Sequence, residues 1–510
     1  MKKIIYSILV LFMFSLTACE DWLDITPKSQ IKADKLFETE DGFKDALVGI
    51  YIGLTDDKAY GQYLTWHILE NFARQYDVSN GIYGDLQMFN YEEGVASDVI
   101  NDIWLKQYNI IAEINKLLEA LEESEDVLNP TMHNVIKGEA LALRALCHLD
   151  LIRLFGHGNH ENRPDLANRL TIPYVTKHTK HLTGQKSYAA TFALMNSDIE
   201  QALELLKSDP YYTGEVDRPD DYEDIISTPF FEGTFLKGRE TRINYGAVLA
   251  LKARAYMWQG DKEKALLAAE DCIAAINYYI NTDINQWATE SWGVGYSNEK
   301  YRDQVFYFEQ LFCLDVGFLK TYISDYYESH LGGNWNNDRL ICDDDFISDI
   351  YDIESGEGLS DLRYVHQLQK EGSSDWLTIK VRKTTGDGVT YFADVIPMLK
   401  ISEPYLIAAE CYMDPASLDK GKAIEYLNLL KAKRNIPDTY FIQNTITDDD
   451  LNTVIYKEYR KEFIQEGQLF YYYKRKGLET YPGLGSVMMT DQQYVLPYPD
   501  IEVDLGGRDQ

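Results

Sequence analysis

Aromatic residues flanked by glycine or amide residues are the positions in this sequence best suited to bind a small ligand. Trp292 and Tyr296 lie in a glycine-containing stretch, and Trp335 follows Asn334 in a run of glycines and asparagines. A ring that small neighbours leave accessible can stack on the C–H face of a sugar, while amides and carboxylates bind its hydroxyls. We therefore expect a ligand site built from aromatic loops, with Trp335 as its first candidate.

A second group of such residues precedes the first long helical segment. It comprises Trp66, Tyr76, Asp77 and Tyr83. Asp77 supplies a carboxylate beside an aromatic ring, which makes it a candidate polar partner for the same ligand. Each ring can equally plug a loop against the protein core, and the sequence leaves both interpretations open.

The N-terminus has the order of features that is typical of a bacterial lipoprotein signal. Two lysines precede an apolar stretch over residues 4–16, and small residues stand just before Cys19. The stretch is too short for a transmembrane helix of about 20 residues. We expect residues 1–18 to be removed and Cys19 to carry the lipid that holds the protein at the membrane.

Signatures of catalysis, cofactor binding and metal binding are weak. His157 and His160 are spaced like helical metal ligands, as are His178 and His181, but no acid or cysteine stands at motif distance. The sequence has no Walker loop, GxSxG or HExxH motif. With 82 acidic residues, carboxylate pairs occur by chance and do not indicate a glycosidase. We expect a protein without enzymatic activity, cofactor or metal.

The charge balance limits the partners of the protein. The chain carries 49 Lys and Arg residues against 82 Asp and Glu residues, a net charge of −33. Such an excess of negative charge argues against nucleic-acid binding, which requires a basic surface to neutralise phosphates. It also favours a neutral glycan over a sulfated or uronic one.

Most of the chain has the apolar period of helices that pack in pairs. The clearest pair surrounds Gly260 and Asp261, where a glycine turn separates two alanine-rich segments in a tetratricopeptide-like hairpin. The sequence predicts a mostly α fold, a tetratricopeptide-like helical-repeat scaffold with long irregular insertions and a small β-hairpin. About four helix pairs are expected, over residues 103–155, 188–258 in part, 245–276 and 401–434.

The expected organisation is one domain over residues 19–510 after the signal at 1–18. Long loops in ordered proteins are usually functional, so we expect the insertions to carry the ligand site. The hairpin is expected at residues 376–396, where alternating apolar residues flank a glycine-rich turn. The scaffold is expected at about residues 30–60, 103–155, 188–276 and 401–476, and the insertions at about 61–95, 208–240 and 281–397.

Several reactive residue types are expected to be structural. Cys147, Cys272 and Cys411 stand among alanines and leucines in helical runs, where a free cysteine is usually a small core residue. The tyrosines at 471–473 are expected in the core as well. The aspartate triplets at 343–345 and 448–450 precede apolar helical runs and are expected to act as N-caps and helix-dipole partners.

Four motifs, in this order, resemble the SusD/RagB family of nutrient-uptake lipoproteins of the Bacteroidetes outer membrane. Residues 19–24 are similar to the mature N-terminus of that family, and residues 137–156 to its EA…RA…L.R.FG helix. Residues 458–475 resemble its E…EF…EG…R segment, and residues 496–502 its closing segment. The chain departs from the family pattern at residues 468–472 and at Lys400, which stands where the family has arginine.

The resemblance implies a surface-exposed outer-membrane lipoprotein that captures an oligosaccharide and delivers it to a TonB-dependent transporter of the SusC type. The acidic pair Glu20 and Asp21, directly after the lipid cysteine, resembles a signal for export to the outer face. Family ligand residues lie in variable loops, so no contact residue is carried over. Two alternatives remain open, a peptide-binding relative that serves peptide uptake and a tetratricopeptide-type adaptor without a small ligand.

Overall fold

The computed structural model describes most of the chain that follows the expected signal. The described residues are 35–76, 82–92, 94–124, 126–213, 215, 235–236, 239, 242–279, 303–319, 321–323, 341–381 and 394–508. The expected signal, Cys19, Asp77, Trp292, Tyr296, Asn334 and Trp335 lie outside them.

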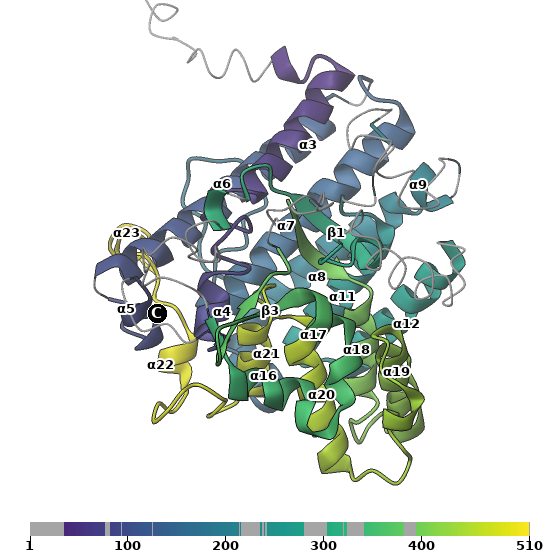
Figure 1. Cartoon of the computed structure of the whole chain (residues 1–510). Coiled ribbons are helices and arrows are strands. Elements are labelled where there is room, and N and C mark those ends of the chain that lie inside the picture. Colours follow the sequence, from purple (N-terminus) through teal and green to yellow (C-terminus); the bar gives the residue numbers. More distant parts are fainter. Residues whose placement is uncertain are drawn as a thin grey trace, which may run out of the picture.

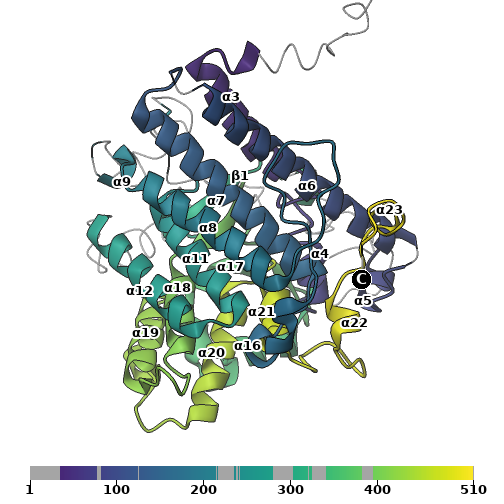
Figure 2. The same cartoon turned by 180° about the vertical axis from the view of Figure 1, so that it is seen from behind.

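Long helices form a continuous row in which each packs against the next (Figures 1 and 2). The same row is visible from both sides, which confirms the mostly α, tetratricopeptide-like helical-repeat scaffold. None of the described helices combines the length and the hydropathy of a membrane span. The row runs through α3 (Glu40–Leu54), α6 (Gly94–Glu123), α7 (Pro130–Phe155), α8 (Tyr188–Leu206), α11 (Tyr245–Gln259), α12 (Lys262–Tyr279), α18 (Ser402–Cys411) and α19 (Lys420–Lys433).

The hairpin of α11 and α12 has the turn that the sequence predicts. Gly260 ends α11 with φ +75°, a left-handed conformation that favours glycine. A Cβ at this position would lie 2.5 Å from the backbone nitrogen of Glu161, so a larger residue would also clash. Ala253 and Ala265 are fully buried, and such small residues allow the two helices to approach closely.

Helix α7, the third helix of the row, is longer than its apolar period indicates. The Asn129 side chain caps it by accepting the Met132 N–H at 2.9 Å, and Pro130 takes the first helical position. Its neighbours are α6 on one side and α8 on the other. Because it is covered on both sides, α7 is apolar around most of its circumference.

A second group of helices packs against the row. Helix α20 packs on α16 and α18, and α21 packs on α4, so segments far apart in the sequence meet here (Figure 1). The group comprises α4 (Ile68–Phe72), α5 (Ile82–Gln87), α16 (Asp344–Tyr351), α17 (Leu362–Gln367), α20 (Asp448–Glu462) and α21 (Leu469–Lys476). The other α-helices in the part of the chain that the structure describes are α9 (Pro210–Thr213), α22 (Asp491–Tyr494) and α23 (Asp500–Asp504).

Within the described residues, two small antiparallel sheets accompany the helices. One pairs β1 (Gln310–Asp315) with β5 (Val395–Lys400). The other has the order β2-β4-β3, with β2 (Ile341–Asp343), β3 (Leu368–Glu371) and β4 (Asp375–Thr378).

The predicted hairpin at residues 376–396 is only partly correct. A strand, β4, does begin there, but its described partners are β2 and β3, which both precede it in the sequence. The turn that joins β3 to β4 contains Gly372 at φ +66°, which makes this shorter turn possible. The expected second strand lies outside the described residues.

The aspartate triplets behave differently at the two helix starts. Asp343 caps α16 as predicted, since its carboxylate accepts the N–H groups of Asp345 at 2.6 Å and Phe346 at 3.2 Å. At α20 the predicted cap is wrong, because the Thr447 hydroxyl accepts the Asp450 N–H at 3.1 Å. The three aspartates there occupy the first turn, where the helix dipole favours negative charge.

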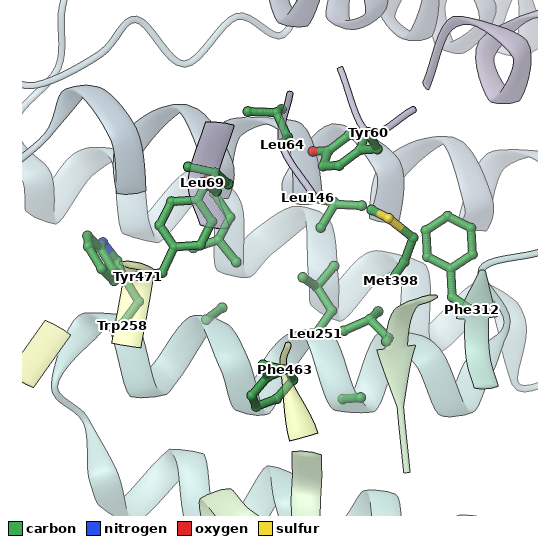
Figure 3. Close-up of a cluster of buried hydrophobic side chains, with 14 of the residues drawn as sticks. Tyr60, Leu64, Leu69, Leu146, Leu251, Trp258, Phe312, Met398, Phe463 and Tyr471 are labelled. Carbon is green, nitrogen blue, oxygen red and sulfur yellow. The ribbon is translucent and has the colours of Figure 1, made fainter. Parts of the chain in front are cut away.

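A large hydrophobic core holds the described elements together. Figure 3 shows side chains of this core that come from distant segments, among them Tyr60, Leu146, Phe463 and Tyr471. The five described cysteines are free and buried, and the tyrosines at 471–473 are buried too, as predicted.

A buried ionic network joins the hallmark segment 458–475 to the rest of the fold. The Glu462 carboxylate lies 2.6 Å from Arg434, 2.7 Å from Arg363 and 3.1 Å from Lys400. Arg434 also pairs with Glu309 at 2.7 Å. These charges lie on α17, α20, β5, the segment before β1 and the end of α19, so the network ties together elements that are distant in the sequence.

Candidate functional site

A pocket of about 400 Å³ lies where five segments of the chain meet, one of them represented by Gln87 of α5. The segment after α4 contributes Arg74, Gln75 and Tyr76, and α16 contributes Phe346. Helix α20 contributes Arg460, and a turn at residues 482–483 closes the other side. We call this cavity the α16 pocket.

The α16 pocket adjoins two of the segments that the sequence predicts to bind a ligand. Tyr76, which lines it, directly precedes Asp77 in the sequence. Asp343, which also lines it, belongs to β2, the first described element after the stretch that contains Asn334 and Trp335.

Three buried polar atoms at this pocket have no hydrogen-bond partner among the described residues. They are Nε of Arg74, Oε1 of Gln75 and Nε of Arg460. Arg460 is only 1% exposed and Gln75 only 2%. Buried polar groups in proteins are nearly always paired, so these three atoms are exceptions within the wall of the pocket.

Aromatic rings hold the two guanidinium groups in position. Arg460 lies 4.7 Å from the centroid of the Phe346 ring, and its Nη1 is 3.5 Å from Asp349. Arg74 lies 5.3 Å from the ring of Phe89 and donates to the backbone carbonyl of Gln87. Burial lowers the pKa of Arg74, which nevertheless stays far above neutral pH as arginine does. The pocket therefore offers fixed donors beside aromatic carbon.

The rim of the pocket is acidic. Asp343, Asp345 and Asp349 line it and are exposed, and Asp349 lies 3.5 Å from Arg460. Carboxylates accept hydrogen bonds and arginines donate them, so hydroxyl groups can be bound from both sides. The mixture of charges gives no strong preference for an anionic ligand.

The structure places the expected site residues in different environments. Tyr76 lines the pocket, although its ring is nearly buried and its hydroxyl donates to the Trp66 carbonyl at 3.3 Å. Trp66 is fully buried and its Nε1 donates to the Gly61 carbonyl at 3.0 Å. Its ring offers no face to solvent. Of the two interpretations that the sequence leaves open, the structure supports the one in which the ring packs in the core.

The other expected ligand residues are not brought together by the described part of the structure. Tyr83 belongs to α5, but its side chain lies outside that part. The same holds for Asp77, Trp292, Tyr296, Asn334 and Trp335.

Sequence reasoning missed the residues that line the α16 pocket most closely. Arg460 lies in a hallmark segment that looks structural, and Arg74 belongs to no motif. Phe346 carries the only local signal, since it is an aromatic residue in the first turn of a helix and remains half-buried. Only the packing of α16 on α20 shows that these side chains meet.

The histidine pair at 157 and 160 has a structural environment. The rings of both contact Tyr188, and His160 also contacts Phe192 and Trp258. Burial lowers the pKa of both histidines to about 4, so they are neutral at pH 7. No group of three or more His, Cys, Asp and Glu side chains in the described residues is arranged to hold a metal ion.

The architecture is that of the SusD superfamily. A crystal structure of a SusD superfamily protein from Bacteroides thetaiotaomicron has a TM-score of 0.67 at 23% identity, covering 91% of this chain and 98% of that chain. A SusD-like carbohydrate binding protein from Bacteroides vulgatus has a TM-score of 0.63 at 17% identity, covering 91% and 96%. At these identities, the likeness establishes the fold.

Family models extend the similarity to the sequence. One, described as "Starch-binding associating with outer membrane", matches residues 21–220, and another, described as "SusD family", matches residues 355–503. The chain belongs to the SusD/RagB family.

Two curated relatives come from Formosa agariphila. SusD-like protein P25 is 25% identical over 171 residues, which are 32% of each chain. SusD-like protein P38 is 23% identical over 294 residues, 56% of this chain and 48% of the relative. The chain thus matches about a third and about half of the length of these relatives.

Proposed function

We propose that this SusD-type protein is a surface-exposed outer-membrane lipoprotein that binds a neutral oligosaccharide and delivers it, without catalysis, to a TonB-dependent transporter. The observation that carries the proposal is the α16 pocket, in which buried polar atoms without partners lie beside aromatic rings. That combination suits a ligand with many hydroxyl groups and apolar ring faces.

Each part of the pocket has a role in this proposal. The guanidinium groups of Arg74 and Arg460 donate to sugar hydroxyls, and the Gln75 carbonyl and the rim aspartates accept from them. Phe346 contacts the apolar face of a sugar ring. Further contacts come from residues outside the described part, namely Trp335, Trp292, Tyr296, Tyr83, Asp77 and Asn334.

Support for a glycan comes from relatives as well as from the pocket. One family model is described by starch binding, and a structural neighbour is a SusD-like carbohydrate binding protein. The net charge of −33 favours a neutral glycan and disfavours nucleic acid.

The proposal is tested by calorimetric titration of the soluble chain of residues 20–510. The titrants are neutral, acidic and host-derived oligosaccharides, with a peptide mixture as control. We expect a micromolar to millimolar signal with one neutral glycan class. Binding of peptides alone would favour peptide uptake instead. No glycan binding, by the soluble chain or by the chain co-purified with its transporter, would overturn the proposal.

The lipid attachment is tested separately with Cys19→Ala. We expect this variant to fold but to leave the membrane fraction, because a thiol is required for the lipid. Ser29→Ala, in the same N-terminal segment, serves as the control and should remain with the membrane. A Cys19→Ala variant that still requires detergent for extraction would contradict the attachment.

A further inference from the structure

A second and larger cavity lies one turn earlier along α20, next to the α16 pocket. It has a volume of about 850 Å³ and is formed by the loop after α18, one face of α20, the end of α21 and the segment after it. Its volume is within the range of small-molecule sites. We call it the C-terminal groove.

The charged side chains of the C-terminal groove are already paired with one another. Lys262 lies 2.6 Å from Glu161 and 3.0 Å from Asp414. Glu410 lies 2.7 Å from Arg475 and 3.2 Å from Lys476.

The balance of these pairs leaves no spare charge. Lys262, Lys476 and Arg475, which pairs with Glu410 from outside the groove lining, balance three carboxylates. Against the penalty of burial, Arg475 and Lys476 hold the pKa of Glu410 well below its usual range. Glu410 is therefore ionised and neutralised at every physiological pH. A charged ligand would have to break an existing pair, whereas an uncharged ligand would not.

Tyrosines from two helices form a wall of the groove. Tyr456 of α20 and Tyr472 of α21 have ring centroids 6.2 Å apart, and Tyr481 lies farther along the chain. Tyr456 is half-buried, so part of its ring faces the cavity. Exposed Thr453 and Thr480 add hydroxyl groups at the rim. An aromatic wall with a polar, neutral rim suits an uncharged ring with hydroxyl groups.

The C-terminal groove and the α16 pocket are neighbours. Pro482 lines both cavities. Helix α20 also serves both, because Arg460 lines the pocket and Tyr456, one turn earlier, lines the groove. The Arg460 guanidinium lies 5.5 Å from the Tyr456 ring, so the two side chains form a shared wall.

The turn at residues 481–483, which we call the Pro482 ridge, separates the two cavities and is held in place by close contacts. The Tyr481 hydroxyl donates to the Phe72 carbonyl at 2.7 Å. Gly483 has φ +86°, and a Cβ there would lie 2.7 Å from Cβ of Arg74, so only glycine allows the turn to pack this closely. A ligand can therefore lie across a ridge of constant shape.

We infer that the C-terminal groove is a second saccharide subsite, which binds another part of the same neutral oligosaccharide that occupies the α16 pocket. This inference rests on the proposed function. It makes affinity depend on chain length, since a disaccharide fills one cavity and a longer chain crosses the Pro482 ridge to reach the other.

Two fluorescent reporters test the inference. Thr453→Cys places a thiol at the groove and Asp345→Cys places one at the pocket, and each is labelled with an environment-sensitive dye. The native cysteines of the soluble chain are buried, so labelling is confined to the introduced thiol. Both are titrated with malto-, cello-, laminari-, xylo- and manno-oligosaccharides, from disaccharides to octasaccharides.

We expect both reporters to respond saturably to the longer members of one series. A response at the pocket alone would overturn the subsite and leave the proposed function intact. A response at the groove alone would support a saccharide site there and overturn the pocket as the primary site. Silence at both reporters would overturn both proposals, and an equal response of the groove to oligogalacturonides would overturn its neutral specificity.

A blocking variant gives an independent readout. Thr480→Trp fills the groove, and we expect it to weaken binding of the octasaccharide at least tenfold while changing disaccharide binding less than twofold. Thr445→Trp, an exposed threonine outside the groove, is the matched control and should change neither. Equal affinities of the Thr480→Trp variant and the unmodified chain for the octasaccharide would contradict the subsite.

Discussion

Two regions along α20 use the same residue types in opposite ways. In the ionic network, Glu462 faces Arg434, Arg363 and Lys400, all within 3.1 Å. In the α16 pocket, Arg460 has a single acidic neighbour at 3.5 Å, and its Nε has no partner among the described residues. One region is electrostatically complete, and the other has unused hydrogen-bonding capacity.

The contrast separates residues that maintain the fold from those that are available to a ligand. A buried charge with several partners contributes little beyond an apolar substitute, but its isolated removal is costly because the partners stay buried. A buried donor without a partner raises the free energy of the empty state, which a ligand can lower by accepting the bond.

The largest effect is expected from removing the centre of the network. Glu462→Ala leaves three buried cations without their shared carboxylate, and we expect the free energy of unfolding to fall by about 3–5 kcal/mol. Urea unfolding measures it, with Glu462→Gln as a variant that keeps hydrogen bonds but loses charge. Lys207→Ala, which removes an exposed ion pair with Glu204, should leave the midpoint unchanged. If Glu462→Ala also leaves the unfolding midpoint unchanged, the ionic network does not maintain the fold and the two regions do not differ in this way.

The next-largest effect is expected from acid, which protonates a carboxylate that pairs with Arg363 of the network. Against the penalty of burial, Arg363 and Lys461 lower the pKa of Glu458 from 4.5 to about 2. Because the pKa of Glu458 is lower in the folded protein, the unfolded chain binds the proton more readily. The ionised carboxylate therefore contributes about 3 kcal/mol of stability above pH 4.5, and this contribution is lost as the pH falls toward 2. Unfolding at several pH values should show a shallower slope for Glu458→Gln, and parallel slopes would refute the assignment.

A substitution in the α16 pocket should lower the affinity for the glycan and leave the stability of the fold unchanged. Phe346→Ala removes the half-buried ring that packs on Arg460, and we expect affinity for the glycan to fall about tenfold, or about 1.4 kcal/mol. Phe318, which is 72% exposed outside the pocket, provides the matched control Phe318→Ala. If both variants bind equally well in calorimetry, the α16 pocket is not the site.

The smallest effect concerns a residue outside the described part. Trp335→Ala should weaken glycan binding by at least about 1 kcal/mol, as expected for the loss of a stacking ring. Thermal unfolding of the same variant should be unchanged. An unaltered calorimetric affinity in a folded variant would remove Trp335 from the site and leave the α16 pocket to act without it.

Local features of the fold were accessible from the sequence because they depend on neighbouring residues. The period of apolar residues predicted the helical row, and Gly260 predicted the turn of its clearest hairpin. The failures were non-local. The partners of β4 were missed because strand pairing depends on segments elsewhere in the chain, and Trp66 could be classified only once its surroundings were known.

The sequence by itself determined the helical class and the family motifs, since spacing along the chain is sufficient for both. The tertiary structure alone decided which side chains share a cavity. Arg74, Phe346 and Arg460 carry no common motif, yet the packing of α16 and the segment after α4 against α20 brings them to one pocket. The unpaired Nε atoms of Arg74 and Arg460 are a property of that packing, because a hydrogen-bond partner can be found missing only once every neighbour has been placed.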